Sequence, residues 1–274
     1  MFTKKPTSLL SVLFLFIFSL TCFAQGDLMV MPKRLVFDGS QRAQEITLVN
    51  TGSDTAVYAI SFIQYKMTEE GNFEQISTPE ENQRFADEFL RYYPRRVNLG
   101  PNEAQTVRVQ LTKTSALENG EYRSHMYFRA IEDQTALGAE NAQEAEGISI
   151  NIKTVFGISI PVIIRNGKSN TQIELSNIYL EQKDEENHQL SMTINRSGNM
   201  SVYGDLLVEY ISTPGKTREI KKVKGISVYT PNTKRNFSME IQDFRKSDLK
   251  NGKLRITYTS DSGDILSVSE LDLK

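Results

Sequence analysis

Residues 147–164 read GISINIKTVFGISIPVII and are the most informative part of the sequence. Apolar side chains occupy most even positions, whereas the odd positions are mostly small or polar. Such alternation places one set of side chains on one face of a β-strand. At about 3.3 Å per residue a strand over 148–164 would span about 56 Å, although strands typically have about five or six residues. A single β-sandwich cannot cover that length, so part of the apolar row should face something outside its own domain.

Two interpretations of this stretch stay open. In the first, it forms two ordinary strands that are broken at Gly157 or Pro161 and are buried in their own core. In the second, the first half of the row adds a strand to the sheet of a partner, whose backbone pairs with it and whose pockets receive alternate side chains. The donated side chains would be Ile148, Ile150, Ile152, Thr154 and Phe156. The side chains that would pack inside the domain are Ile158, Ile160, Val162 and Ile164.

The rest of the chain consists of short runs rich in β-branched and aromatic residues, each bounded by turn residues. About seven such runs occupy the first part of the chain, and a second set follows the polar turn at 165–168. We expect one short helical turn, at 80–91, and a mobile loop at 132–147. These patterns predict an all-β fold of two β-sandwich domains. The first domain should cover 25–166, and a smaller second domain should cover 167–274.

The N-terminus has the pattern of an export signal. Two lysines precede an apolar run at 9–20, and Cys22-Phe23-Ala24 places small residues where a signal peptidase cleaves. We expect removal of 1–24, with cleavage before Gln25, and export of the mature chain. A membrane anchor and a lipidated Cys22 are the alternatives. Cys22 is the only cysteine of the sequence, so the mature chain would contain no disulfide and no thiol or cysteine-metal site.

Charge and motifs argue against several function classes. The sequence has 32 basic and 34 acidic residues, and removing the two signal lysines leaves 30 basic ones, too few for a typical nucleic-acid-binding protein. Its two histidines, His125 and His188, lie far apart in sequence without metal-ligand spacing. The sequence contains no nucleophile elbow, glycine-rich phosphate loop or zinc-protease motif. We therefore expect a binding protein without cofactor or metal, and a glycosidase with unpatterned carboxylates is the remaining enzymatic alternative.

Four motifs follow one another through the first domain. They are KRLVFDG at 33–39, PRRVNLGPNEAQTVRV at 94–109, YRSHMYFRAI at 122–131 and FGISIPVII at 156–164. Together they resemble the PapD-like periplasmic chaperones of pilus and fimbrial assembly, whereas the second domain is similar to that family only in size and strand pattern. The resemblance implies two immunoglobulin-like β-sandwiches in a boomerang arrangement, with no use of a cofactor or of ATP.

The resemblance also implies a function. Such chaperones bind unfolded pilus or fimbrial subunits in the periplasm, lend them the last strand of the first domain and deliver them for assembly of a surface fibre. The expected partners are therefore the subunits and an outer-membrane usher, and neither nucleic acid nor metal is expected. A structural or adhesive immunoglobulin-like protein of the cell surface is the alternative, because nothing in the second half of the sequence argues against it.

In the PapD-like family an arginine of the first strand and a lysine of the donated strand hold the terminal carboxylate of the subunit. Arg34 matches that arginine in its RLVFDG context, and its guanidinium can donate two parallel hydrogen bonds to a carboxylate. Pro161 stands where the lysine is expected, a form that we associate with non-classical members of the family. The second cation could be Lys153, Arg123 or Arg165, or could be absent.

Overall fold

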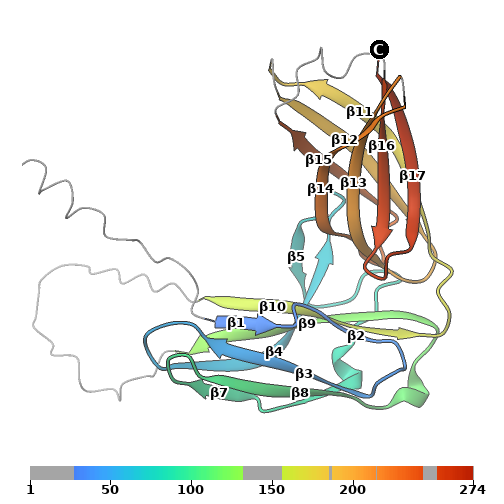
Figure 1. Ribbon diagram of the computed structural model, residues 1–274. Helices are drawn as coiled ribbons and strands as arrows, with labels where there is room; N and C mark the ends of the chain where they lie inside the picture. The colour runs from blue at the N-terminus through green and yellow to red at the C-terminus, as the bar shows by residue number, and fades with distance from the viewer. Residues whose placement is uncertain (1–27, 132–155, 185–186, 214, 243–251, 274) are drawn as a thin grey trace, which may run out of the picture.

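The structure, a computed structural model, describes residues 28–131, 156–184, 187–213, 215–242 and 252–273. In these ranges the chain forms 17 β-strands and two short 3-10 helices. None of these helices has the length and apolar character that a membrane crossing requires. The strands make four sheets, which pair into two sandwiches set at an angle to one another (Figure 1). The expected fold class is confirmed: the described chain is all-β, with two immunoglobulin-like β-sandwiches in a boomerang arrangement.

The first sandwich consists of two sheets. The smaller one is antiparallel throughout and contains, in spatial order, β1 (Leu28–Met31), β3 (Ala43–Asn50), β8 (Ala104–Leu111) and β6 (Leu90–Tyr93). The larger one contains β2 (Leu35–Phe37), β10 (Gly157–Asn166), β9 (Gly120–Ile131), β4 (Ala56–Met67) and β5 (Phe73–Ile76), and β7 (Arg96–Leu99) also pairs with β4. The 3-10 helices η1 (Asp87–Phe89) and η2 (Thr114–Ala116) lie in two of the connections.

Alternating side chains build the core between these two sheets. In β8, Val107 and Val109 are fully buried while Arg108 between them is exposed, as the alternation of TVRVQL predicts. The second half of the long apolar row alternates in the same way in β10. Burial of each large apolar side chain contributes about 1.5–3 kcal/mol to the stability of the domain. The buried members of this half of the row are Ile160, Val162 and Ile164, and Ile158 packs partly against the same cluster. The prediction that this half of the row packs inside the domain is confirmed.

Two expectations for the first sandwich are wrong in detail. The helical turn expected at 80–91 is only the single 3-10 turn η1, and β6 follows it directly. The described part of this sandwich also contains ten strands rather than about seven, because the sequence patterns do not predict β1, β5, β6 and β7. Each of these has four residues, too few for alternation to be visible. Each becomes a strand by pairing with a longer neighbour.

Strand β10 has a neighbour on both sides over only part of its length. It pairs with β9 from Gly157 to Asn166, whereas its parallel pairing with β2 covers only Val162 to Ile164. Among the described residues, 157–161 therefore pair with a strand on one side only. Pro161 lies at the end of that one-sided stretch, which suits a residue without an N–H to donate to a further strand.

The second sandwich pairs a three-stranded with a four-stranded antiparallel sheet. The first contains β11 (Gln172–Gln182), β12 (His188–Ser197) and β15 (Lys234–Ile241). The second contains β14 (Thr217–Val228), β13 (Val202–Ser212), β16 (Gly252–Ser260) and β17 (Ile265–Leu273). The sequence patterns predict all of these strands except β17, although its sequence ILSVSELDL alternates well enough to have been recognised.

The hairpin of β4 and β5 reaches from the first sandwich towards the second (Figure 1). At the end of β4, the Asn232 side chain donates to the backbone oxygens of Met67 and Thr68, at 2.8 and 3.2 Å. The Met67 side chain also packs with Ile163 and Tyr229 in a small buried cluster that joins the domains. These contacts hold the hairpin as one wall of the space between the two sandwiches.

Candidate functional site

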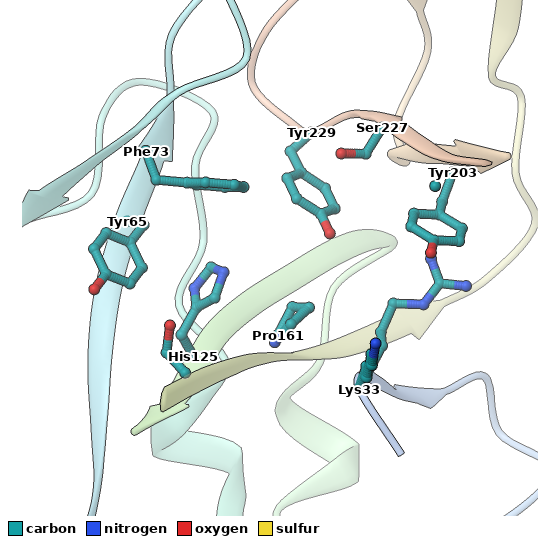
Figure 2. Close-up of a pocket in the computed structure, with 11 residues that line it drawn as sticks. Lys33, Tyr65, Phe73, His125, Pro161, Tyr203, Ser227 and Tyr229 are labelled. Carbon is teal, nitrogen blue, oxygen red and sulfur yellow. The ribbon is translucent and has the colours of Figure 1, made fainter. Parts of the chain in front are cut away.

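A cavity of about 490 Å³ lies between the two sandwiches. Its lining residues are Lys33, Arg34, Tyr65, Phe73, His125, Ser159, Pro161, Tyr203, Gly225, Ser227 and Tyr229. Figure 2 shows the side chains of Tyr65 and Phe73 at one end of the cavity and those of Lys33 and Tyr203 at the other. The cavity therefore has an aromatic end and a cationic end, and both domains contribute to it.

The cationic end contains Lys33 and Arg34, which directly precede β2. The carbon of the Arg34 guanidinium lies 3.8 Å from the centroid of the Tyr203 ring, in cation–π contact. Its Nη2 donates to Oδ2 of Asp261, so the arginine of the first domain is held by two residues of the second. Lys33 is exposed and has no ion pair with any described residue. Two adjacent positive charges with free N–H donors suit this end of the cavity to an anionic group.

The aromatic end is a cluster of rings, in which Phe73, Tyr65 and His125 make edge-to-face contacts and the Phe73–Tyr229 pair is tilted. Phe73, which is 47% exposed, lies 6.0 Å from Tyr65, 5.8 Å from His125 and 6.0 Å from Tyr229, measured between ring centroids. Tyr65 and His125 are 5.0 Å apart and nearly perpendicular. Such ring pairs are rigid and present apolar surface with few groups that need hydrogen bonds. This end of the cavity suits an apolar side chain.

His125 in this cluster is a neutral side chain. Burial, and to a lesser degree the charge of Arg123, lower the pKa of His125 from its ordinary value of 6.5 to about 3. The ring nitrogen Nδ1 is buried and has no hydrogen-bond partner among the described residues. A neutral imidazole at physiological pH neither repels a cation nor attracts an anion, so the charge of the site comes from Lys33 and Arg34.

Arg123, a candidate for the second cation, does not line the cavity. Its side chain is buried, its guanidinium lies over the Tyr229 ring at 4.2 Å, and its Nη2 donates to the Thr230 oxygen at 3.0 Å. Burial lowers the pKa of Arg123, and the nearby carboxylate of Glu121 opposes that effect. Arg165 also pairs with Glu121, and its Nε lies 3.3 Å from Oε2 of Glu121. In the described residues both arginines therefore belong to the contact between the domains.

The structure places the donated row only in part. Phe156 is described, and its side chain is 68% exposed. Ile148, Ile150, Ile152 and Thr154 lie outside the described residues, and so does Lys153. The one-sided stretch 157–161 continues from Phe156 to the cavity, where Ser159 and Pro161 line its floor. An open strand edge thus leads directly to the cationic end.

This arrangement fits the end of a polypeptide chain. An extended segment can pair with an open edge through its backbone, because N–H and C=O groups on that side have no strand partner. A carboxylate at its end would then lie near Lys33 and Arg34, and a side chain next to it could contact the rings of Phe73 and Tyr229. The described residues offer no group of three or more metal-ligating side chains.

Several residues of the site escape the sequence reasoning, among them Tyr65 and Phe73 of the aromatic end. Lys33 was visible only as the first letter of the KRLVFDG motif, beside the expected arginine. Tyr203, Tyr229 and Asp261 carry no recognisable signal, because they lie some 170 or more positions from Arg34 in sequence, and only the angle between the domains brings them to it.

Comparisons with known proteins find similarity in structure but none in sequence families or curated sequences. No family model matches the chain, and no curated protein sequence matches it. Among solved structures it is similar to the YadV chaperone, at 12% identity and a TM-score of 0.46, over 90% of this chain and 100% of that one. It is similar to a chain of the CsuC–CsuE chaperone–tip adhesion subunit complex from the Csu pili of Acinetobacter baumannii, at 12% identity and a TM-score of 0.45, over 89% of this chain and 98% of that one. It is also similar to the E. coli chaperone DraB, at 13% identity and a TM-score of 0.43, over 90% of this chain and 96% of that one. Similarity at this level leaves the function to be inferred from the residues of the chain itself.

Proposed function

We propose that this chain is a periplasmic chaperone that binds pilus or fimbrial subunits by donating a β-strand and delivers them for assembly of a surface fibre. The observation that carries the proposal is the open edge of β10 at 157–161, which ends at the cationic end of the cavity. Three of the four motifs that resemble the PapD-like family lie on β2, β9 and β10, the strands around this edge. The partners would be the subunits and an outer-membrane usher.

Binding would combine three contributions. A subunit segment pairs with the open edge of β10 and its continuation, so that main-chain hydrogen bonds supply affinity. Its terminal carboxylate binds Arg34 and Lys33, and hydrogen bonds to charged groups contribute about 1.5–3 kcal/mol each. The row Ile148, Ile150, Ile152, Thr154 and Phe156 fills a groove of the subunit, at about 1.5–3 kcal/mol for each large apolar side chain that becomes fully buried.

The remaining parts of the proposal follow from the same site. The chain acts by binding alone, without a cofactor and without catalysis, and His125 stays neutral rather than serving as an acid or base. Residues 1–24 are cleaved as the signal for export to the periplasm, and the domains divide at Asn166 into 25–166 and 167–274. A purely structural role on the cell surface is disfavoured, because a structural module does not need two cations beside an open strand edge.

Co-expression tests the proposal. The chain is expressed with the secreted proteins that are encoded beside its own gene, and a tagged copy is isolated from the periplasmic fraction. We expect a stable one-to-one complex with at least one neighbour, and loss of that neighbour from the cell when the gene for the chain is deleted. Retention of the chain on the cell exterior, with no bound neighbour, would instead support the structural alternative.

A further inference from the structure

We infer that Asp261 is a built-in competitor for the carboxylate site: it holds Arg34 in the free chain and must be displaced when a terminal carboxylate binds. This inference rests on the proposed function, because it concerns the regulation of the same anchor. Asp261 lies in the turn between β16 and β17 of the second domain, and it pairs with Arg34 of the first. The pair therefore joins the two walls of the cleft.

Arg34 stands between two cavities. Arg34 and Tyr203 both line the large cavity that contains Lys33, and both also line a second cavity of about 180 Å³. Asp261 and Asp264 belong to the lining of the second cavity and not to that of the first. Asp261 thus holds the guanidinium from the small cavity, while a ligand that follows the open edge of β10 arrives from the large cavity.

The two carboxylates would compete for one guanidinium. A guanidinium can bind a carboxylate at two points either through Nε and Nη2 or through Nη1 and Nη2. Each geometry uses one of the two N–H groups of Nη2, and Oδ2 of Asp261 accepts a hydrogen bond from Nη2. Asp261 therefore occupies one of the two geometries, and its charge repels a carboxylate that takes the other. A ligand forms its strongest contact with Arg34 after Asp261 has moved.

Asp261 is placed so that it can move. Its side chain is 57% exposed, whereas the side chain of Arg34 is 18% exposed. Ion pairs with one exposed partner contribute little to stability, because the released carboxylate regains its hydration. In the free chain, Asp261 would prevent small anions from binding Arg34. A small anion makes no further contacts, so its binding free energy would be too small to displace Asp261. In the complex, the same side chain would stand ready to take the guanidinium back, which makes the anchor reversible.

Peptide binding to purified full-length chain tests the inference. The probes are a synthetic peptide of alternating valine and threonine that ends in a free carboxylate, and the same peptide with a C-terminal amide. The variants are Asp261→Asn, Arg34→Ala and, as the matched control, Asp264→Asn. Asp264 lies in the same turn and lines the same small cavity, but it accepts a hydrogen bond from Ser262, and among the described residues no hydrogen bond or ion pair joins it to Arg34.

We expect Asp261→Asn to bind the carboxylate peptide about two- to fivefold more tightly than the wild type, with slower dissociation and unchanged binding of the amide. The Asp264→Asn variant should match the wild type with both peptides. Equal or weaker carboxylate binding by Asp261→Asn would overturn the inference, since Asp261 would then orient Arg34 rather than compete for it. Equal tightening of both peptides would overturn it as well.

Failure of the proposed function would look different. It would appear already in the wild type, as equal affinity for the two peptides and no loss of affinity in Arg34→Ala. That result would remove the anchor itself, and the competitor with it. A preference for the carboxylate that Arg34→Ala abolishes, together with no gain in Asp261→Asn, would leave the anchor in place and reject only the competitor.

Discussion

At the scale of single residues, Arg34 is the side chain on which capture depends most. We predict that Arg34→Ala abolishes subunit capture while the fold stays intact. Capture should fail because two hydrogen bonds to a charged group, each about 1.5–3 kcal/mol, are lost together. Folding should survive because the partner Asp261 is largely exposed and such pairs contribute only about 0–1 kcal/mol. Pull-down of a co-expressed subunit measures capture, and a thermal melt measures the fold.

Two further variants make the Arg34 prediction specific. Arg34→Lys keeps the charge but loses the two-point geometry, so it should capture subunits only weakly. Arg42→Ala removes an exposed arginine that lies outside the cavity lining, and it should behave as the wild type. Wild-type capture by Arg34→Ala would remove Arg34 from the site.

His125 makes a pH-dependent contribution to stability. Its pKa is about 3 in the folded chain and 6.5 when the ring is exposed, so between these values the unfolded chain binds more protons. The contribution of His125 to the free energy of unfolding is therefore fully present well above pH 6.5 and is lost as the pH falls towards 3. Between pH 6.5 and pH 5 the wild type should lose about 2 kcal/mol from this residue. We predict that the stability of His125→Phe falls by about 2 kcal/mol less than that of the wild type over the same pH range. Denaturant titrations at the two pH values measure this difference. Equal losses in both proteins would mean that His125 is not buried as a neutral ring.

At the scale of elements, alternation predicts the strands that carry a complete buried row. β3, β8 and the second half of the long apolar stretch in β10 are recognisable because every second side chain enters the core. The short strands β5 and β7 are not, since they exist only because β4 offers them a pairing edge. Sequence alone cannot show that β2 pairs with β10 over three positions only, and that limit is what leaves 157–161 open.

The two halves of the apolar row should respond differently to charge. Ile160→Asp with Val162→Asp should unfold the first domain, because Ile160 is 3% and Val162 0% exposed and buried unpaired carboxylates are poorly tolerated. Ile150→Asp with Ile152→Asp should change the melting temperature little and still destroy subunit binding, since charges would enter a dry groove of the partner. The exposure of Ile150 and Ile152 stays a prediction, because both lie outside the described residues. Thermal melts of the two double variants decide it, and equal, large losses would mean that the whole row is ordinary core.

At the scale of the whole molecule, the site is a product of the angle between the domains. In the first-domain half, Arg34 and the strand β10 could be predicted from motifs and alternation, whereas the open edge at 157–161 could not. The second-domain half, Tyr203, Tyr229 and Asp261, could not, because its position depends on how two separately folded sandwiches pack against one another. Side chains that fix this packing therefore matter to the site although they do not line it.

Glu121 is the central residue of that packing. Its side chain is fully buried, and it accepts hydrogen bonds from the N–H and the hydroxyl of Ser201 in the second domain. In the first domain it pairs with Arg165, whose Nη2 in turn donates to the Ser201 oxygen at 2.9 Å. Its Oε1 also lies 3.8 Å from Nη1 of the buried Arg123. One carboxylate thus compensates a buried cation and joins the two sandwiches.

We predict that Glu121→Gln loosens the whole molecule without unfolding either sandwich. Breaking a buried pair by removing one partner costs about 3–5 kcal/mol, because the remaining charge stays buried. That cost falls on the contact between the domains, so calorimetry should resolve two transitions where the wild type gives one, and small-angle scattering should indicate a wider range of angles. Peptide affinity should fall although Arg34 is intact, because Tyr203 and Tyr229 are no longer held opposite it.

Glu118→Gln is the control, since Glu118 is 77% exposed and pairs with Arg84 at the surface. A single transition with unchanged scattering in Glu121→Gln would show that other contacts, such as the bonds from Asn232 to the β4–β5 hairpin, set the angle between the domains.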